Sequence, residues 1–456
     1  MAVAKGGKTV WEEGFGLTSF KSGAPVTPDT MFPAASITKG LTATGLMILV
    51  ERGKVDPDRP ANDYLGPAGL RSVVEGSPAP TIRNLIFMTA GLPMHWHMYY
   101  TDRPERAPDM DESIRRYGLL AMVPGEEYQY SNFGYGILGH VIARVSGQSY
   151  PDFMAQEVFA PLGMTRTAIL GDPPALRDVA AKFDEGRREL PFCGFDHPGA
   201  SAAYVSARDL LRFGLFHLGS GWPGAKPPLS KATLSAMHTR SESSTLDSGL
   251  PVKMLLGCFA QIDYQGVRFM SVTGGMPGAV SRLDLIPAEG LASVILANAG
   301  NADLWTLQQA IFGAFVPALR DAPPLPDAGK EAGTAAPFVV PEDLIGRWSG
   351  KVRVEDKNLA AALSFRKGSD PQLEIDGKTT SPLSVRTELG PMTCKDGIFS
   401  GLFWGTIKTP DTTGRAHVVF VRVKLRGNKL TGTLSAVSTD ARRNFCLPHA
   451  VVLVRE

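Results

Sequence analysis

Two serines of this chain stand three residues before a lysine, a spacing that can turn a serine into a nucleophile. Ser36 precedes Lys39, and Ser364 precedes Lys367. On a helix, residues i and i+3 lie on one face, so the amine can reach the hydroxyl. A serine attacks an acyl group only after a base removes its proton, and a lysine can act as that base when it is neutral. The spacing alone is weakly specific, because most such pairs lie on surface helices.

Tyr130 and Asn132 favour Ser36 over Ser364 as the reactive serine. A phenol can relay a proton to a leaving group, and an amide can hold a lysine or a substrate carbonyl. Both residues lie at the start of a predicted helix, where Ser131 and Asn132 are also good N-caps. The catalytic and the structural interpretation are compatible, and we assign Ser364 no chemistry.

A third element is the segment Val-Thr-Gly-Gly from Val272 to Gly275, which ends a predicted strand. Glycines on a strand edge let a substrate lie close to the backbone. The alternative is a tight hairpin without further function.

The elements that must position these residues are mixed helices and strands. Apolar spacing predicts helices over Ser36–Arg52 and Asn132–Val145, closed by Gly53 and Gly147. Alternating or β-branched runs predict strands and intervening turns, which form an antiparallel sheet flanked by helices. The strands are expected at Lys8–Gly16, Val267–Val272, Ser281–Ile286 and Ala292–Ala297, with turns at 274–278 and 287–290.

The chain is too long for one hydrophobic core, since its 456 residues exceed the roughly 250–300 residues at which single cores stop growing. Residues 321–339 are rich in Pro, Gly and Ala and predict a linker. Residues 1–320 then form an α+β domain. Residues 340–456 contain short alternating runs between turn residues, which predict a separate all-β barrel.

Composition excludes several classes of protein. The 47 basic and 45 acidic residues give a net charge of +2, which disfavours nucleic-acid binding. No apolar run approaches the roughly 18–20 residues of a membrane span. The N-terminus carries no signal-peptide pattern, so we expect a cytoplasmic protein.

The cysteines are too scattered for a zinc knuckle or redox motif, and free buried thiols fit a cytoplasmic compartment better than a Cys394–Cys446 pair. The four are Cys193, Cys258, Cys394 and Cys446.

The order Ser-x-x-Lys, Tyr-x-Asn and strand-end Thr-Gly resembles the β-lactamase and penicillin-binding-protein superfamily. The branch it looks most like is that of class C β-lactamases, D-aminopeptidases and esterases. This resemblance implies that residues 1–320 include an all-α subdomain beside the sheet. The segments Thr30–Lys39, Leu85–Pro93 and Pro124–Tyr135 also resemble family segments. The similarity covers roughly residues 3–315, and together the motifs are highly specific.

This resemblance implies a role for each matching residue. Ser36 would be the nucleophile and Lys39 its base, alone or with Tyr130. Tyr130 would protonate the leaving group and activate water, while Asn132 would bind Lys39 and substrate. The backbone N–H groups of Ser36 and Gly275 would form the oxyanion hole. Substrate would lie along Val272, Thr273 and Gly274.

Val272 departs from the family, which normally has Lys or His at this position. That cation faces a substrate carboxylate and lowers the pKa of the tyrosine, and valine does neither. We therefore expect neutral esters or amides rather than penicillins, and an impaired site is the alternative. No counterpart of the deacylating glutamate of class A enzymes is found. Glu126 and Glu127 are interpreted as a solvated loop.

The loop after Pro93 carries histidines and aromatic residues that allow two interpretations. His95 and His97 have the spacing of metal ligands, but no further ligand follows at a recognisable distance, so we predict no metal and no cofactor. Trp96 and Tyr99 either shape the acyl pocket or belong to an aromatic cluster under the loop. Outside this loop, Asp209 is expected to be a structural acid in a first helical turn.

The C-terminal part begins with Gly346, Arg347 and Trp348, a pattern similar to the start of lipocalin-like barrels. Such barrels are appended to some peptidases and peptide cyclases of the superfamily. This resemblance leaves open whether the barrel covers the active-site mouth or mediates oligomers.

Together these observations predict a hydrolase that cleaves amides or esters through an acyl-enzyme at Ser36. A peptidase or amidase for short peptides, including peptides with D-residues, is favoured. A carboxylesterase, a peptide-cyclising thioesterase and a non-catalytic binding or sensor protein remain alternatives, and a true β-lactamase is less favoured. The expected partner is a small-molecule or short-peptide acyl substrate, and a homo-oligomer remains open.

Overall fold

The computed structural model describes most of the chain. The described residues are 1–172, 178–221, 226–247, 251–323, 338–354, 357–383, 392–440 and 444–456. Most of the predicted linker 321–339 lies outside them.

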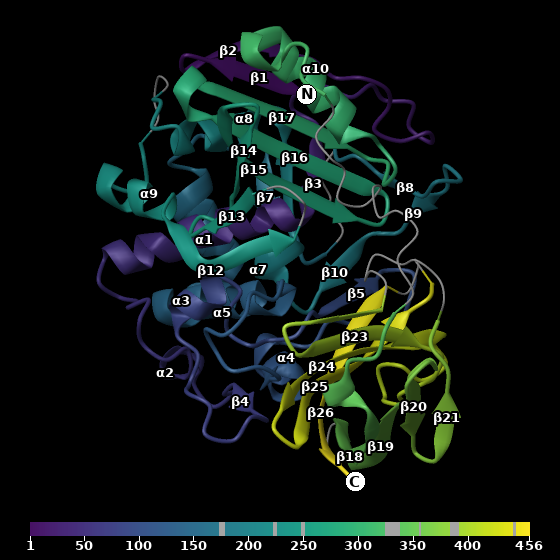
Figure 1. The fold of residues 1–456 in the computed structure, drawn as a ribbon. Coiled ribbons are helices and arrows are strands. Elements are labelled where there is room, and N and C mark those ends of the chain that lie inside the picture. Colours follow the sequence, from purple (N-terminus) through teal and green to yellow (C-terminus); the bar gives the residue numbers. More distant parts are fainter. Residues whose placement is uncertain are drawn as a thin grey trace.

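The N-terminal part is built on an eight-stranded antiparallel sheet (Figure 1). Its strand order is β12-β13-β14-β15-β16-β17-β1-β2, so the first two strands of the chain add to the edge formed by β17. The strands are β1 (Ala2–Lys5), β2 (Lys8–Glu12), β12 (Arg240–Asp247), β13 (Pro251–Leu255), β14 (Ala260–Tyr264), β15 (Val267–Met276), β16 (Ala279–Ile286) and β17 (Leu291–Ala297).

Helices cover both faces of this sheet. Because side chains alternate along a strand, Leu283 and Leu285 of β16 face α8 (Ala207–His217), close to Gly214. Ile286 faces the opposite side and joins Phe312 of α10 (Leu304–Phe315) in a second cluster. The predicted layer arrangement is confirmed.

Ser36 lies in the η1 turn (Ala35–Ile37), which contacts β15 and β16 of the sheet and also the helices packed beside it. Helix α1 (Thr38–Glu51) is almost wholly buried and contacts α5 (Asn132–Ser146) and α7 (Pro198–Ser201). Both predicted helices are confirmed, with Gly53 and Gly147 in the left-handed region after them. The other elements are η1 (Ala35–Ile37), α2 (Asn62–Leu65), α3 (Ile82–Ile86), α4 (Met110–Tyr117), α6 (Tyr150–Phe153), η2 (Met154–Phe159), α9 (Lys231–Met237), η3 (Pro287–Glu289), η4 (Pro317–Leu319), η5 (Glu342–Leu344), β3 (Met31–Pro33), β4 (Arg71–Ser72), β5 (Trp96–Tyr100), β6 (Leu119–Leu120), β7 (Thr167–Ile169), β8 (Lys182–Phe183), β9 (Glu189–Leu190), β10 (Cys193–Phe195) and β11 (Ala203–Ser206).

Two predicted boundaries were wrong. Strand β2 ends at Glu12, not at Gly16. Strand β15 continues through the two glycines to Met276, so the turn is confined to Pro277 and Gly278. Glycine weakens a strand but does not end it when the neighbouring strand supplies the pairing, as β16 does here.

The C-terminal part is the predicted all-β structure, a curled sheet in the order β21-β20-β19-β18-β26-β25-β24-β23-β22. The segment after β21 pairs with the end of β23 through Pro382 and Phe403, which brings the two ends of the sheet together. The strands are β18 (Gly346–Val354), β19 (Lys357–Phe365), β20 (Gln372–Ile375), β21 (Lys378–Thr380), β22 (Thr393–Lys395), β23 (Ile398–Phe403), β24 (His417–Arg426), β25 (Lys429–Ser438) and β26 (Phe445–Arg455).

Strand β5 of the N-terminal part joins this C-terminal sheet (Figure 1). His97 pairs with Phe445 and Trp96 pairs with Cys446 of β26. The barrel is therefore linked by backbone pairing to the segment that follows His95.

Ion pairs add to this contact and correct one expectation. Glu127 pairs with Arg422 at 2.8 Å, and Glu126 pairs with Arg426 and with Lys424. The loop before Tyr130 is therefore not simply solvated, because β24 supplies it with cations.

The cysteines are free, as predicted, and Cys394 is half-buried while the other three are buried. Among the described helices, none has both the length and the apolar character that crossing a bilayer requires.

Trp348 provides a test of the barrel core. It is fully buried, and its indole N–H donates to the Leu344 carbonyl at 2.8 Å. Trp348→Ala is expected to lower the free energy of unfolding by about 3–5 kcal/mol, because a large cavity remains. Trp404→Ala is the matched control, since Trp404 is 56% exposed, and should change stability by less than about 0.5 kcal/mol. Equal effects of the two substitutions in denaturant titrations would contradict the packing described.

Candidate active site

Ser36 lies in the short η1 turn between β3 and α1, and the residue before it has an unusual backbone conformation. The preceding residue, Ala35, is buried and has φ 45°, which is uncommon for any residue except glycine. Such strain persists only where the surroundings impose it. Here Ala34 donates its N–H to the Ala203 carbonyl at 2.8 Å, which ties the turn to β11.

Lys39 is 1% exposed, and its amine has a partner for each of its protons. Nζ lies 3.0 Å from Ser36 Oγ, 2.7 Å from Asn132 Oδ1 and 3.2 Å from the Ala200 carbonyl. An ammonium donates three hydrogen bonds, so these partners satisfy it fully. A neutral amine can keep the bonds to Asn132 and Ala200 and accept the proton of Ser36.

Tyr130, which lies far from Ser36 in the sequence, contacts the same hydroxyl. Its phenol oxygen lies 2.6 Å from Ser36 Oγ, and the Lys39 amine lies 4.8 Å from its ring centre. The serine proton can therefore pass to the Tyr130 oxygen, or to the Lys39 amine when that amine is neutral, and both lie within the hydrogen-bond reach that general base catalysis requires.

Asn132 is free to hold Lys39 because its neighbour caps the helix. Ser131 accepts the Gly134 N–H as the N-cap of α5. Asn132 then accepts from Lys39 through Oδ1, while its Nδ2 donates to the His95 carbonyl at 3.1 Å. These two contacts fix the orientation of the amide.

Strand β15 presents an open edge beside Ser36. Strand β14 begins at Ala260, opposite Ser271, and no strand of the described chain pairs with that edge beyond this point. Thr273 and Gly275 are exposed there, whereas Gly274 is buried. A Cβ on Gly274 would lie 2.2 Å from the Ala34 carbonyl oxygen and 3.0 Å from Ser36 N, so β15 and the Ser36 turn are in direct contact.

Val272 is buried on the same strand at 7% exposure. Its side chain supplies no charge to the site, as expected from the sequence. The N–H groups of Ser36 and Gly275 remain a prediction as oxyanion donors.

The predicted pocket residues of the following loop make contacts with other elements. The Trp96 indole donates to Asn444 Oδ1 at 2.6 Å. Its ring packs against a small apolar cluster of the barrel, made of Leu402, Val418, Phe420, Val437 and Cys446. The Tyr99 hydroxyl lies 2.7 Å from His97 Nδ1, and both side chains are buried. These contacts bring neither aromatic residue to Ser36, and their role in substrate binding stays a prediction.

The two histidines of this loop contact different partners. His97 Nε2 lies 3.1 Å from Arg415, whereas His95 Nε2 lies 2.8 Å from Asp196. Burial lowers the pKa of His97 to about 4. His95 instead forms a buried group with Asp196 and His197, the one cluster of metal-ligand type that is found among the described residues.

The sequence analysis missed three residues of the site's surroundings. The acceptor at Ala200 is a backbone carbonyl, for which no residue type gives a signal. Asp196 and His197 are adjacent in the sequence, and two polar residues within an otherwise apolar segment are the only signal for them. Burial opposes ionisation of Asp196, but the charge of His95 and the hydrogen bonds from both histidines outweigh it and hold the pKa of the carboxyl well below its usual range.

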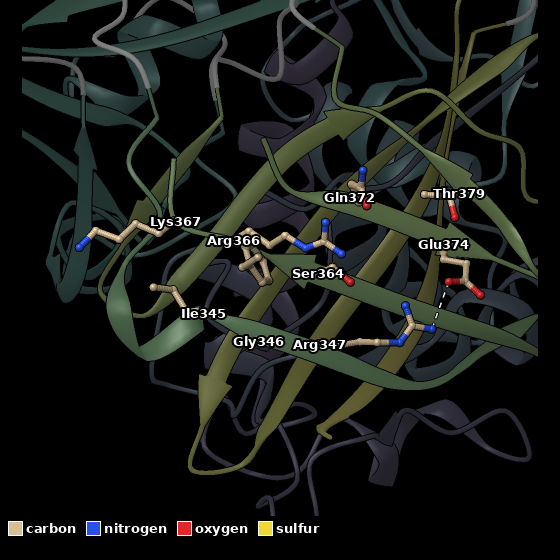
Figure 2. A pocket seen from close by; sticks show the side chains of 10 residues that line it. Ile345, Gly346, Arg347, Ser364, Arg366, Lys367, Gln372, Glu374 and Thr379 are labelled. Carbon is tan, nitrogen blue, oxygen red and sulfur yellow. Dashed lines mark hydrogen bonds and ion pairs between the residues drawn. The ribbon is translucent and has the colours of Figure 1, made fainter. Parts of the chain in front are cut away.

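The second Ser-x-x-Lys match has none of these surroundings. Ser364 is near the end of β19 and not on a helix, and Figure 2 shows Lys367 extending away from it. Both line a pocket on the barrel in which Arg347 and Glu374 form an ion pair at 3.1 Å. No chemistry is assigned to it, in agreement with the sequence analysis.

Asp209 has the structural role predicted for it. It lies in the first turn of α8, and it accepts the Arg166 N–H and the Thr167 hydroxyl.

A helix-flanked antiparallel sheet with a serine, a lysine and a tyrosine in mutual contact defines the β-lactamase/transpeptidase-like class of proteins. A family model described as Beta-lactamase matches residues 1–306. The chain belongs to this family, whose members are serine hydrolases.

Curated relatives carry different activities in their names. Over 320 residues the chain is 29% identical to unguisins hydrolase ungD' from Aspergillus campestris, covering 65% of this chain and 58% of that protein. It is 32% identical over 178 residues to penicillin-binding protein 4* from Bacillus subtilis, covering 37% of each chain. It is 30% identical over 200 residues to esterase EstB from Burkholderia gladioli, covering 41% of this chain and half of that protein. The chain thus spans less than two thirds of the length of these three relatives.

Solved structures share the fold over the whole chain. SurE aligns with a TM-score of 0.62 at 23% identity, covering 100% of this chain and 94% of its own. The octameric penicillin-binding protein homologue from Pyrococcus abyssi aligns with a TM-score of 0.59 at 20% identity, covering 99% and 94%. The two-part architecture therefore recurs in both.

Gly274 and Gly275 form a matched pair for testing the contact between β15 and Ser36. Gly274→Ala is expected to destabilise the protein by about 1–3 kcal/mol, because the new methyl group meets backbone atoms that cannot move freely. A Cβ on Gly275 meets nothing within 4 Å, so Gly275→Ala should leave the melting temperature nearly unchanged. Thermal unfolding of both variants checks this, and an equally stable Gly274→Ala protein would contradict the close approach.

Proposed function

We propose that this protein is a serine hydrolase that forms an acyl-enzyme at Ser36. The observation that carries the proposal is the position of one serine oxygen, 3.0 Å from the Lys39 amine and 2.6 Å from the Tyr130 phenol. A hydroxyl between two proton acceptors, on a turn held under backbone strain, is typical of an activated nucleophile.

The reaction would proceed in two steps. Lys39, alone or with Tyr130, takes the proton as Ser36 Oγ attacks the acyl carbon, and the N–H groups of Ser36 and Gly275 stabilise the oxyanion. Tyr130 then protonates the leaving group as the scissile bond breaks. In the second step Tyr130 takes a proton from the water that attacks the acyl carbon. As the bond between the acyl carbon and Ser36 Oγ breaks, Lys39, alone or with Tyr130, returns a proton to Oγ, which regenerates the serine hydroxyl.

Amides of short peptides are the favoured substrates. The open edge of β15 at Thr273 and Gly275 can pair with an extended peptide, which gains backbone hydrogen bonds there. Val272 disfavours substrates that need a cation for a terminal carboxylate. A relative named as a hydrolase of unguisins and a structural neighbour solved with D-Leu are consistent with peptides that contain D-residues. Because one relative is named an esterase, a carboxylesterase is the second candidate function.

The barrel and the oligomeric state are part of the same proposal. We propose that residues 1–320 form the hydrolase domain, that 340–456 form a barrel domain, and that 321–339 connect them. A homo-oligomer is consistent with the octameric homologue.

A cyclising thioesterase, in which an amine replaces water, would use the same acyl-enzyme.

Labelling with a fluorophosphonate probe tests the proposal, because the probe reacts with activated serines and not with ordinary ones. The wild-type protein should be labelled on the peptide that contains Ser36, and Ser36→Ala should lose the label. Ser364→Ala is the matched control, since it removes the other Ser-x-x-Lys serine, and it should be labelled at the wild-type rate. A folded wild-type protein that remains unlabelled would overturn the enzyme proposal in favour of a binding protein.

Substitution of Val272 tests the substrate class. Val272→His restores the kind of cation that the family uses, and it is expected to raise kcat/KM for a substrate with a free carboxylate by about tenfold, or about 1.4 kcal/mol. Val272→Met controls for side-chain size and should give no such gain. The measurement compares benzylpenicillin with neutral p-nitrophenyl esters and aminoacyl anilides. If the wild-type enzyme cleaved benzylpenicillin fastest, the preference for neutral substrates would be wrong.

A further inference from the structure

We propose that Asp196 is a positioning residue that holds in place the two carbonyl groups on which the arrangement around Lys39 depends. One carbonyl belongs to His95 and orients Asn132, and the other belongs to Ala200 and binds Lys39 directly. The proposal rests on the proposed function of Ser36, and it adds a residue that none of the three sequence motifs contains.

The Asp196 carboxylate binds two histidines, one with each oxygen. Oδ2 lies 2.8 Å from His95 Nε2, and Oδ1 lies 2.5 Å from His197 Nδ1. All three residues are at most 1% exposed. A buried carboxylate is tolerated only when it is fully paired, so both contacts are strongly favoured over their loss.

The His95 branch controls Asn132. The His95 carbonyl accepts the Asn132 Nδ2 hydrogen bond at 3.1 Å. The His95 ring packs against Tyr117 and Phe133, with ring centres 4.8 and 4.9 Å away. With its ring fixed by packing and by Asp196, His95 presents its carbonyl at a defined position, and that position keeps Asn132 Oδ1 turned towards Lys39.

The His197 branch controls Ala200. His197 precedes α7, and its carbonyl accepts the Ala200 N–H at 3.0 Å. A Cβ on Gly136 would lie 2.7 Å from His197 Cβ, so α5 packs directly on this residue. The Ala200 carbonyl one turn later accepts from Lys39 Nζ at 3.2 Å. A shift of His197 would therefore move an acceptor of the lysine.

A carboxylate suits this role because it offers two acceptor atoms to two N–H donors. Asparagine has one acceptor oxygen and one NH2 group, so in Asp196→Asn one of the two histidines must lose its contact or change to the tautomer that accepts at that ring nitrogen. The same three side chains also have the composition of a partial metal-ligand set, which the test includes as an outcome.

A double-mutant cycle with Asn132→Ala tests the proposal. Asp196→Asn is expected to slow acylation of Ser36 by a fluorophosphonate or a p-nitrophenyl ester about 10–100-fold, with a smaller change in KM. In the Asn132→Ala background the same substitution should have a smaller effect, because its route through Asn132 is already lost and only the route through Ala200 remains. Asp284→Asn is the matched control. Asp284 is equally buried, pairs with Arg282 on β16 and faces away from Lys39, so it should leave acylation nearly unchanged in the folded protein.

Hydrogen exchange gives a second measurement that does not require activity. Asp196→Asn should increase amide exchange in residues 95–98 and 197–203 relative to Asp284→Asn. Additive effects in the cycle would overturn the route through His95 and Asn132. Unchanged exchange in both segments would overturn the positioning role as a whole, as would a stoichiometric metal ion released on denaturation of the wild-type protein. A wild-type protein that never reacts would overturn the proposed function alone, and the exchange measurement would still decide whether Asp196 holds both segments.

Discussion

The burial of one amine constrains much of this structure. Lys39 is removed from water within a helix-packed core, where an ammonium without partners would cost several kcal/mol. Its three hydrogen-bond partners come from three different elements: Ser36 from η1, Asn132 from α5 and Ala200 from α7. The relative positions of these elements are therefore coupled to the protonation and placement of a single side chain. The same requirement fixes the position of the Ser36 hydroxyl, which lies 3.0 Å from the Lys39 amine.

The C-terminal barrel contacts two segments that carry residues of this arrangement. Strand β5 begins one residue after His95, whose carbonyl orients Asn132, and β5 pairs with β26 of the C-terminal sheet. Arg422 and Arg426 meet the glutamates just before Tyr130. The segment that contains His95 and the loop before Tyr130 are thus both held by contacts with the barrel.

The helical spacing of Ser36 and Lys39 allowed their contact to be predicted from the sequence. The contact between Lys39 and Asn132 was expected from the resemblance to the β-lactamase superfamily, and the catalytic roles of these residues stay a prediction. The helices around Ser36 and Asn132 and the strands of the central sheet could be predicted from local apolar patterns. The extension of β15 through Gly274 and Gly275 was missed, since strand propensity does not show that β16 pairs with both. Asp196, the Ala200 carbonyl and the pairing of β5 with β26 depend on contacts between distant segments, which no local pattern encodes. The ion pairs of Glu126 and Glu127 were missed on the same grounds.

The central claim is that Ser36 Oγ carries the acyl group during turnover. The most direct measurement is intact-protein mass spectrometry of enzyme quenched during turnover of a p-nitrophenyl ester, followed by peptide mapping. The account predicts a covalent acyl adduct on the peptide containing Ser36, formed as fast as the first turnover releases p-nitrophenol. Turnover without any adduct on Ser36, or with the adduct on another side chain, would contradict it.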